Sequence, residues 1–206
     1  MRPDSGEGGA DVILYINACV RKESRTKVLA DHLIGKLLEQ AEKKGAKEKV
    51  EEVDLGKVLF PVADEEFINH RVDLEEACSW DDPMFDLAKQ FARADQVVVA
   101  APYWDLSFPA ALKQYFEQIN VMGITFEYTP EGTPRAMCKA EKLYYVMTAG
   151  GVFCPEEFGF GYVRAMSESF YGIKEFEYIQ ALGLDIDGAD EKKIVGDAIK
   201  EIDKLF

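Results

Sequence analysis

The sequence predicts a three-layer α/β fold built on a five-stranded parallel sheet. Two observations carry this expectation. Short apolar segments alternate along the chain with longer segments whose apolar residues recur at helical spacing. Residues 97–101 are apolar without alternation, which is typical of a strand covered on both faces. No internal repeat is visible, so one domain is expected over residues 11–206, after a flexible tail at residues 1–10.

The first quarter of the chain predicts a strand, a helix and an edge strand. Asp11–Asn17 is a short apolar segment, and a polar loop follows at Ala18–Thr26. Leucines then recur at helical spacing until Gly45, which is typical of a helix end. Lys49–Leu55 is a weaker strand that alternates only in part, which favours a place at the edge of the sheet.

A long segment without a clear period precedes the third strand. Gly56–Asp82 contains at most short helices, over Glu65–Arg71 or Asp73–Trp80. A connection of this length inside a compact domain is usually functional or mobile. From Pro83 onward apolar residues again mark one face of a helix, which leads into the strand Gln96–Ala101.

The middle of the chain predicts a helix and a small hairpin. Residues 108–119 have an apolar stripe at helical spacing, with Ser107 as the expected N-cap and Pro109 in the first turn. Ile124–Thr129 alternates like a strand, and we expect it to pair with residues near Arg135–Cys138 outside the main sheet.

The last third predicts two strands and two helices. Lys142–Thr148 is the fourth main strand, and the later part of Glu156–Tyr171 is expected to be helical. Lys174–Leu182 is the fifth strand. Glu191–Leu205 has the apolar spacing of an amphipathic helix that covers the sheet.

Composition excludes several classes of function. The net charge of −14 argues against a nucleic-acid partner, because no stripe of Lys and Arg is present to neutralise phosphates. No apolar segment is long enough to span a bilayer, so no membrane partner is expected. The first residues lack the basic start and apolar core of a secretory signal, which predicts a cytoplasmic protein.

The cysteines and histidines do not predict a metal site. Cys19, Cys78, Cys138 and Cys154 lie far apart without a CxxC spacing, and in a cytoplasmic chain they are expected to be free thiols. The chain has only two histidines, His32 and His70, and no group of Cys or His residues with the spacing of metal ligands, so no protein-bound metal is expected. His70 is either a proton donor, if it reaches the functional pocket, or an ordinary surface histidine.

Three unusual loops are expected at one edge of the sheet. In open α/β sheets ligands bind beyond the carboxyl ends of the strands, where the winding direction reverses. Ser24, Arg25 and Thr26 precede the first helix, whose N-terminal amides attract an anion such as a phosphate. Ordinary helix capping explains Ser24 equally well, but it does not explain Arg25 and Thr26.

The other two loops fit a flat ligand. Tyr103 and Trp104 lie just beyond the third strand, where aromatic rings can stack on a planar ligand or simply fold onto the core. Gly150 and Gly151 lie just beyond the fourth strand, where glycines let the backbone approach a ligand or form a plain turn. The Gly-x-Gly-x-x-Gly spacing of a dinucleotide fingerprint is absent after the first strand.

Three segments together resemble a known family. Ala101–Asp105 (APYWD), Leu112–Phe116 (LKQYF) and Gly123–Thr129 (GITFEYT) are similar to the patterns Ala-Pro-x-Tyr/Trp-Asn, Leu-Lys-x-Tyr/Phe-Phe-Asp and Gly-x-Thr-Phe-x-Tyr. These are patterns of the flavodoxin-like NAD(P)H:quinone oxidoreductases and FMN-dependent azoreductases, and the likeness covers nearly the whole chain from Asp11. It implies a flavodoxin-like three-layer sandwich with strand order 2-1-3-4-5.

The resemblance also implies a cofactor, its contacts and a homodimer. FMN would be held without a covalent bond, and an active site at the subunit boundary would bring Tyr128 and Phe170 into the substrate pocket. The cofactor-binding positions that the resemblance implies are Cys19, Ser24, Arg25 and Thr26 for the phosphate, Pro102, Tyr103, Trp104, Asp105 and Leu106 for the isoalloxazine, and Thr148, Ala149, Gly150 and Gly151 for its pyrimidine end.

The chain departs from the family pattern at three places. Cys19 stands where relatives often have serine, which removes one hydroxyl contact, and Asp105 replaces the usual asparagine. An ionised carboxylate near a flavin disfavours its anionic reduced form unless the contact is made by the backbone. The glycine turn is also one residue shorter. These changes bear on redox tuning and substrate choice more than on FMN binding.

The predicted function is therefore a flavin-dependent oxidoreductase. NADH or NADPH would deliver two electrons to the flavin, and a quinone, azo or nitroaromatic acceptor would then collect them at the same place, in a ping-pong sequence. The flavin performs the chemistry, so no protein nucleophile is required. Two alternatives stay open: a flavodoxin-type electron carrier, which the acidic balance fits, and a flavin-free regulatory or binding protein on the same fold.

Overall fold

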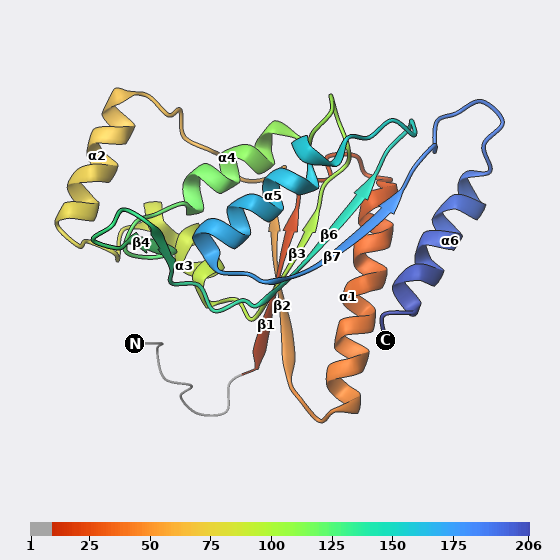
Figure 1. Ribbon diagram of the computed structural model, residues 1–206, viewed down its shortest axis with the longest axis horizontal. Coiled ribbons are helices and arrows are strands. Elements are labelled where there is room, and N and C mark those ends of the chain that lie inside the picture. The colour runs from red at the N-terminus through yellow and green to blue at the C-terminus, as the bar shows by residue number, and fades with distance from the viewer. Residues whose placement is uncertain (1–9) are drawn as a thin grey trace.

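The computed structural model describes residues 10–206, so residues 1–9 of the expected tail lie outside the described residues. Its centre is a five-stranded sheet in the order β2-β1-β3-β6-β7, with every neighbouring pair parallel (Figure 1). The strands are β1 (Asp11–Asn17), β2 (Glu48–Asp54), β3 (Gln96–Ala100), β6 (Lys142–Thr148) and β7 (Glu175–Ala181). Without the two hairpin strands, this is the predicted order 2-1-3-4-5, which is thereby confirmed.

Burial along the strands follows their positions in the sheet. In β3, at the centre, every residue after Gln96 is buried, because helices cover both faces. In β2, only Val53 is buried, as expected of a strand with one free edge. The prediction of an edge strand from its partial alternation is therefore confirmed.

Two helices cover one face of the sheet. These are α1 (Arg25–Lys43) and α6 (Glu191–Asp203), which lie side by side in Figure 1. Leu29, Leu33 and Leu37 of α1 are buried against the sheet. The helix ends at Lys44, and Gly45 follows with φ +70°, a left-handed conformation that glycine adopts without strain.

The opposite face is rich in aromatic residues. It is covered by α3 (Asp86–Arg93), α4 (Ala110–Ile119) and α5 (Phe160–Met166), and α5 continues into a π-helical turn at Ser167–Tyr171. Phe91 and Tyr171 meet edge to face with ring centroids 4.7 Å apart, which fixes the π-helical turn against α3.

Two segments extend beyond the three layers. The long connection after β2 forms a single helix, α2 (Glu65–Glu76), rather than either of the shorter helices expected, and none of its residues is buried. Arg71 joins α2 to the end of α4 by donating to the carbonyls of Glu117 (2.9 Å) and Asn120 (2.5 Å). The expected hairpin forms from β4 (Phe126–Tyr128) and β5 (Pro134–Ala136), which are antiparallel.

The start of α4 differs from the prediction. Ser107 does not cap this helix, which begins at Ala110 after Pro109 and has no side-chain cap. The Ser107 hydroxyl instead donates to the carbonyl of Phe158 at 2.5 Å. Ser107 also pairs with Trp104 through two backbone hydrogen bonds of 2.8 and 3.0 Å, so it belongs to the preceding turn.

Two further features of the described residues concern membrane spans and metal ions. Between residues 10 and 206, no helix combines the length and apolarity required to cross a membrane. Over the same range, no three His, Cys, Asp or Glu side chains are grouped so that they could hold a metal ion.

Candidate functional site

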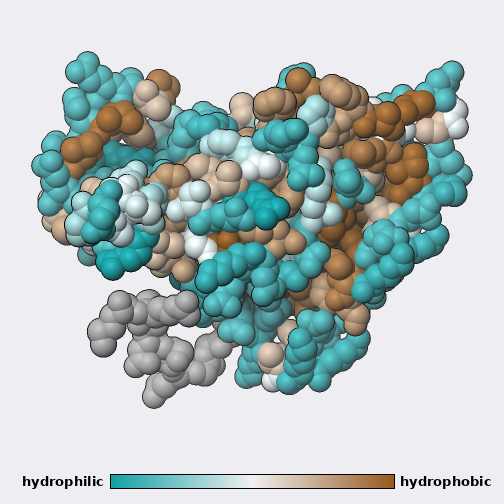
Figure 2. Space-filling view, viewed as in Figure 1, coloured by the Kyte–Doolittle hydropathy of each residue, from teal (hydrophilic) through white to brown (hydrophobic). Residues whose placement is uncertain are grey.

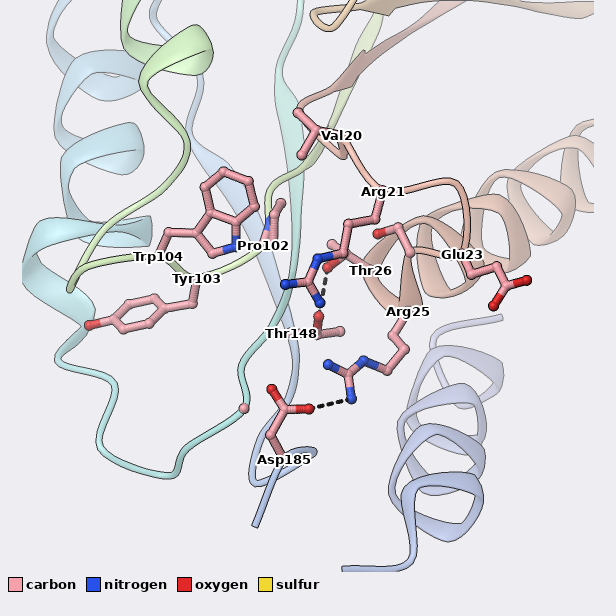
Figure 3. Close-up of a pocket in the computed structure, with 12 residues that line it drawn as sticks. Val20, Arg21, Glu23, Arg25, Thr26, Pro102, Tyr103, Trp104, Thr148 and Asp185 are labelled. Atoms are coloured by element: carbon pink, nitrogen blue, oxygen red, sulfur yellow. Dashed lines mark hydrogen bonds and ion pairs between the residues drawn. The ribbon is translucent and has the colours of Figure 1, made fainter.

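A pocket opens at the carboxyl edge of the sheet, where the winding direction reverses between β1 and β3. Its volume is about 200 Å³. Figure 3 shows that loops after β1, β3 and β6 meet there, as predicted, together with a fourth loop after β7. The lining residues are Val20, Arg21, Glu23, Ser24, Arg25, Thr26, Pro102, Tyr103, Trp104, Thr148, Gly150 and Asp185.

The N-terminus of α1 forms one wall of the pocket. Ser24 is the N-cap, and its hydroxyl accepts from the backbone N–H of Lys27 at 3.3 Å. Arg25 and Thr26 supply the first N–H groups of the helix, which no carbonyl of the helix can accept. The buried hydroxyls of Thr26 and Thr148 lie 2.6 Å apart, which links this wall to the end of β6. The wall therefore offers hydroxyl and N–H donors to an anion.

The two arginines of the pocket differ in their partners. Arg25 donates to Asp185 at 2.8 Å and to Glu191 and the Leu184 carbonyl at 3.4 Å. This ion pair lowers the pKa of Asp185 from its usual value. Arg21 is exposed, and within residues 10–206 it has no ion pair or hydrogen bond; Figure 3 shows its side chain extending into the pocket.

The aromatic loop after β3 forms the opposite wall. The Tyr103 N–H donates to the Thr148 carbonyl at 2.9 Å and its hydroxyl to the Pro155 carbonyl at 3.0 Å, so both ends of this residue are fixed. Trp104 is 39% exposed and faces the pocket. Asp105 and Leu106 close the turn with φ +51° and +68°, a left-handed conformation that costs non-glycine residues energy.

The glycine loop after β6 is paired with the loop after β7. The N–H groups of Gly183, Leu184 and Asp185 donate to the carbonyls of Gly151, Ala149 and Gly150, over 2.9–3.1 Å. A Cβ on Gly150 would lie 2.3 Å from Oδ2 of Asp185. Glycine is therefore required at 150 because the Asp185 side chain packs against its backbone.

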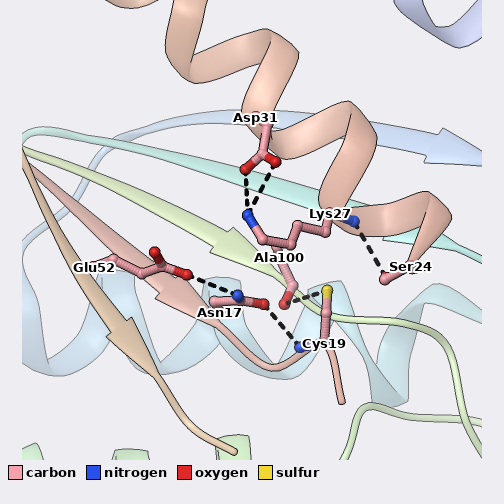
Figure 4. A network of polar contacts seen from close by, with 7 residues as sticks. All are labelled: Asn17, Cys19, Ser24, Lys27, Asp31, Glu52 and Ala100. Carbon is pink, nitrogen blue, oxygen red and sulfur yellow. Dashed lines mark hydrogen bonds and ion pairs between the residues drawn. The ribbon is translucent and has the colours of Figure 1, made fainter. Parts of the chain in front are cut away.

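Cys19 is buried and is not among the residues that line the pocket. Figure 4 shows its Sγ directed at the Ala100 carbonyl, 3.8 Å away, while its N–H donates to the Asn17 side chain at 2.9 Å. Asn17 in turn donates to Glu52 at 2.8 Å. Burial raises the pKa of Cys19 to about 11, so the thiol stays protonated near neutral pH.

The predicted cofactor positions divide into two groups. Eight of them line the pocket, as the list above shows. Cys19, Asp105, Leu106, Ala149 and Gly151 belong to the same loops but lie outside the lining. Ala149 is buried, whereas Asp105 and Leu106 are exposed at the tip of the aromatic turn. Their roles in binding a cofactor stay predictions.

The predicted substrate residues and His70 lie outside this pocket. Tyr128 and Phe170 both contact Phe126 edge to face, with ring centroids 5.4 and 4.9 Å apart, beside the β4–β5 hairpin. His70 is exposed on α2. Neither the two aromatics nor His70 is among the lining residues of one chain.

Sequence reasoning missed Asp185 as a pocket residue. The prediction considered the loops after the first, third and fourth strands but not after the fifth. A signal was available, since Leu182, Gly183, Leu184 and Asp185 follow a parallel strand that ends at the same edge.

Comparisons with known proteins agree with the geometry of the fold. A family model described as "Flavodoxin-like fold" matches residues 12–206. The chain is 35% identical to an FMN-dependent NADH:quinone oxidoreductase of Coprothermobacter proteolyticus, over 94% of this chain and 96% of that protein. It is also 35% identical to one of Lachnoclostridium phytofermentans, over 86% and 89%. An azoreductase structure from Bacillus anthracis superposes with a TM-score of 0.80 at 24% identity, over 95% of this chain and 98% of that one.

Proposed function

The chain belongs to the flavodoxin-like fold family that includes the FMN-dependent NADH:quinone oxidoreductases, and from this premise we propose that it holds FMN in the carboxyl-edge pocket. The resemblance drawn from the sequence motifs is thereby confirmed at the level of the family. The proposed reaction moves two electrons from NADH or NADPH to a quinone, azo or nitroaromatic acceptor. Free thiols at all four cysteines, together with a nicotinamide substrate, support a cytoplasmic location.

The donor chemistry of the pocket fits FMN. One wall supplies what a phosphate monoester needs: the first N–H groups of α1, the Thr26 hydroxyl and a guanidinium. The other wall supplies Trp104, a partly exposed aromatic surface for a planar ring. The juxtaposition of a phosphate-type wall and an aromatic wall in one pocket is the observation that carries the proposal.

In this scheme the role of the protein's own residues is to bind and orient the FMN. When bound, FMN would supply the redox chemistry itself. Trp104 and Pro102 would hold the ring, and the backbone between Thr148 and Gly150 would lie along its edge. The ping-pong order needs only that donor and acceptor occupy the same open space in turn.

We further propose a homodimer in which Tyr128 and Phe170 line the partner's pocket. Large apolar side chains are exposed on the loop after β6, where Val152 and Phe153 are 65% and 77% exposed, and Figure 2 shows apolar surface gathered over the upper ends of β6 and β7. Tyr128 on the hairpin is 52% exposed. Surfaces of this kind mark interaction sites. Sedimentation of the full chain tests the proposal, and a monomer at all concentrations would contradict it.

A visible spectrum followed by anaerobic NADH tests the main proposal. The full-length protein is expected to bind added FMN, to be yellow, and to bleach rapidly when NADH or NADPH is added. A yellow protein that bleaches only when a separate reductase is present would favour the electron carrier. A protein that takes up no FMN would favour a flavin-free binding role on this fold.

A further inference from the structure

The two pocket arginines are not equivalent anion sites. Arg25 is engaged by two carboxylates and a carbonyl, and its side chain is only 23% exposed. Its main partner, Asp185, is itself fixed by its backbone bond to Gly150 and by packing against that glycine. All of these bonds are made by Nη1 of Arg25, and the two carboxylates beside its guanidinium oppose the approach of a further anion.

Arg21 is placed differently. It lies on the loop between β1 and α1 and lines the same pocket, and Figure 3 shows its side chain extending into the pocket. Within residues 10–206 no carboxylate pairs with it. Lys27, the nearest lysine in α1, is held by both carboxylate oxygens of Asp31 at 2.7 and 2.9 Å. Among these three cations, Arg21 alone has no carboxylate partner in the part of the chain that the structure describes.

We infer that Arg21, and not Arg25, holds the phosphate of the proposed FMN. Arg25 then has a structural role, in which its ion pair with Asp185 joins the start of α1 to the loop after β7. The inference rests on the proposed function, and it names the residue by which this chain distinguishes FMN from riboflavin, which lacks the phosphate. A guanidinium suits this task because it presents several N–H donors in a fixed plane.

The test compares FMN with riboflavin in four proteins. Each flavin is titrated into flavin-free wild type, Arg21→Gln, Arg25→Gln and Lys22→Gln, and binding is followed by quenching of flavin fluorescence. Lys22→Gln is the matched control, because it removes the same charge from the neighbouring position outside the pocket lining. Melting temperatures of all four proteins are measured without flavin.

We expect Arg21→Gln to weaken the binding of FMN but not that of riboflavin. Loss of one charge-assisted hydrogen bond should weaken FMN binding by Arg21→Gln about 10- to 100-fold, with riboflavin binding within about 2-fold of wild type. Arg25→Gln should lower the melting temperature and leave the ratio of FMN to riboflavin affinity unchanged. Lys22→Gln should resemble wild type in every measurement.

Other results would overturn the inference in distinguishable ways. If wild type binds FMN well and Arg21→Gln binds it equally well, the inference is wrong while the proposed function stands. If only Arg25→Gln loses the preference for FMN, the two roles are reversed. If wild type binds neither flavin, the proposed function fails and this inference with it.

Discussion

The two walls of the pocket are built in opposite ways. The α1 wall presents Ser24 and Thr26 from the first turn of a 19-residue helix, backed by a buried hydroxyl pair. The aromatic wall presents Trp104 from a two-residue turn whose tip, Asp105 and Leu106, is in left-handed conformation. The polar groups of the pocket are thus placed by regular structure, whereas its flat apolar surface is placed by a strained loop.

Replacing Trp104 with alanine should produce the largest effect. Stacking of a ring on an aromatic side chain contributes about 1–3 kcal/mol, so FMN and riboflavin should both bind about 10- to 100-fold more weakly. Fluorescence titration measures this effect, and Trp104→Phe should retain most of the affinity. Unchanged binding of both flavins would remove Trp104 from the site. Because riboflavin is affected equally, this variant contrasts with Arg21→Gln and separates the two walls.

Replacing Gly150 with alanine should destabilise the contact between the loop after β6 and the loop after β7. The new Cβ would lie 2.3 Å from Oδ2 of Asp185, so the carboxylate must move and the pair with Arg25 is disturbed. A cost of about 1–3 kcal/mol is typical of such overpacking. Chemical denaturation measures the free energy of unfolding. In an Asp185→Ala background, Gly150→Ala should lower the free energy of unfolding much less. If it lowers this free energy by the same amount as in wild type, Asp185 is not the cause of the destabilisation.

Replacing Thr26 with valine tests the buried hydroxyl pair of the α1 wall. The Thr148 hydroxyl would lose its 2.6 Å partner inside the protein, at a cost of about 1 kcal/mol in the free energy of unfolding. Thr26→Ser keeps the hydroxyl and should recover most of this loss. Equal stabilities of Thr26→Val and Thr26→Ser would mean that the pair contributes nothing measurable.

Removing the ion pair between Arg25 and Asp185 should give the smallest effect, which is measured as a pH-dependent change in melting temperature. The pair lowers the pKa of Asp185, so its contribution is present above the ordinary value of about 3.9 and is lost as pH falls through the lowered pKa. Wild type should therefore melt higher than Asp185→Asn near neutral pH, and the difference should begin to shrink below about pH 3.9 and vanish below the lowered pKa of Asp185. A difference that grows in acid would contradict this assignment.

Regular periodicity made most of the fold predictable. The bounds of β1 and β6 match the sequence prediction, those of β2 and β7 differ from it by one residue at each end, and β3 ends one residue earlier than predicted. In α1, buried leucines at helical spacing and Gly45 just beyond the end predicted both the face and the end of the helix. These features are local, and each depends only on a few neighbouring residues.

Features that depend on distant partners could not be predicted. The Ser107 hydroxyl bonds to Phe158, which is 51 residues away, so its local pattern wrongly predicted a helix cap. Arg25 was expected to bind phosphate, yet its 2.8 Å pairing with Asp185 spans 160 residues. Arg21 has no such partner in the described chain, and only the structure distinguishes the two. Single-sequence reasoning identified the loops of the site but not which charges remain available in them.

The attachment of α2 has a consequence for how this protein can change. Leu74 packs against the core and Arg71 bonds to α4, while Ile68 and Val72 remain 46% and 43% exposed. Substitutions at these two exposed positions should leave the sheet and its pocket undisturbed. The exposed face of α2 is therefore a region where mutation can create a new interaction surface without changing the residues of the pocket.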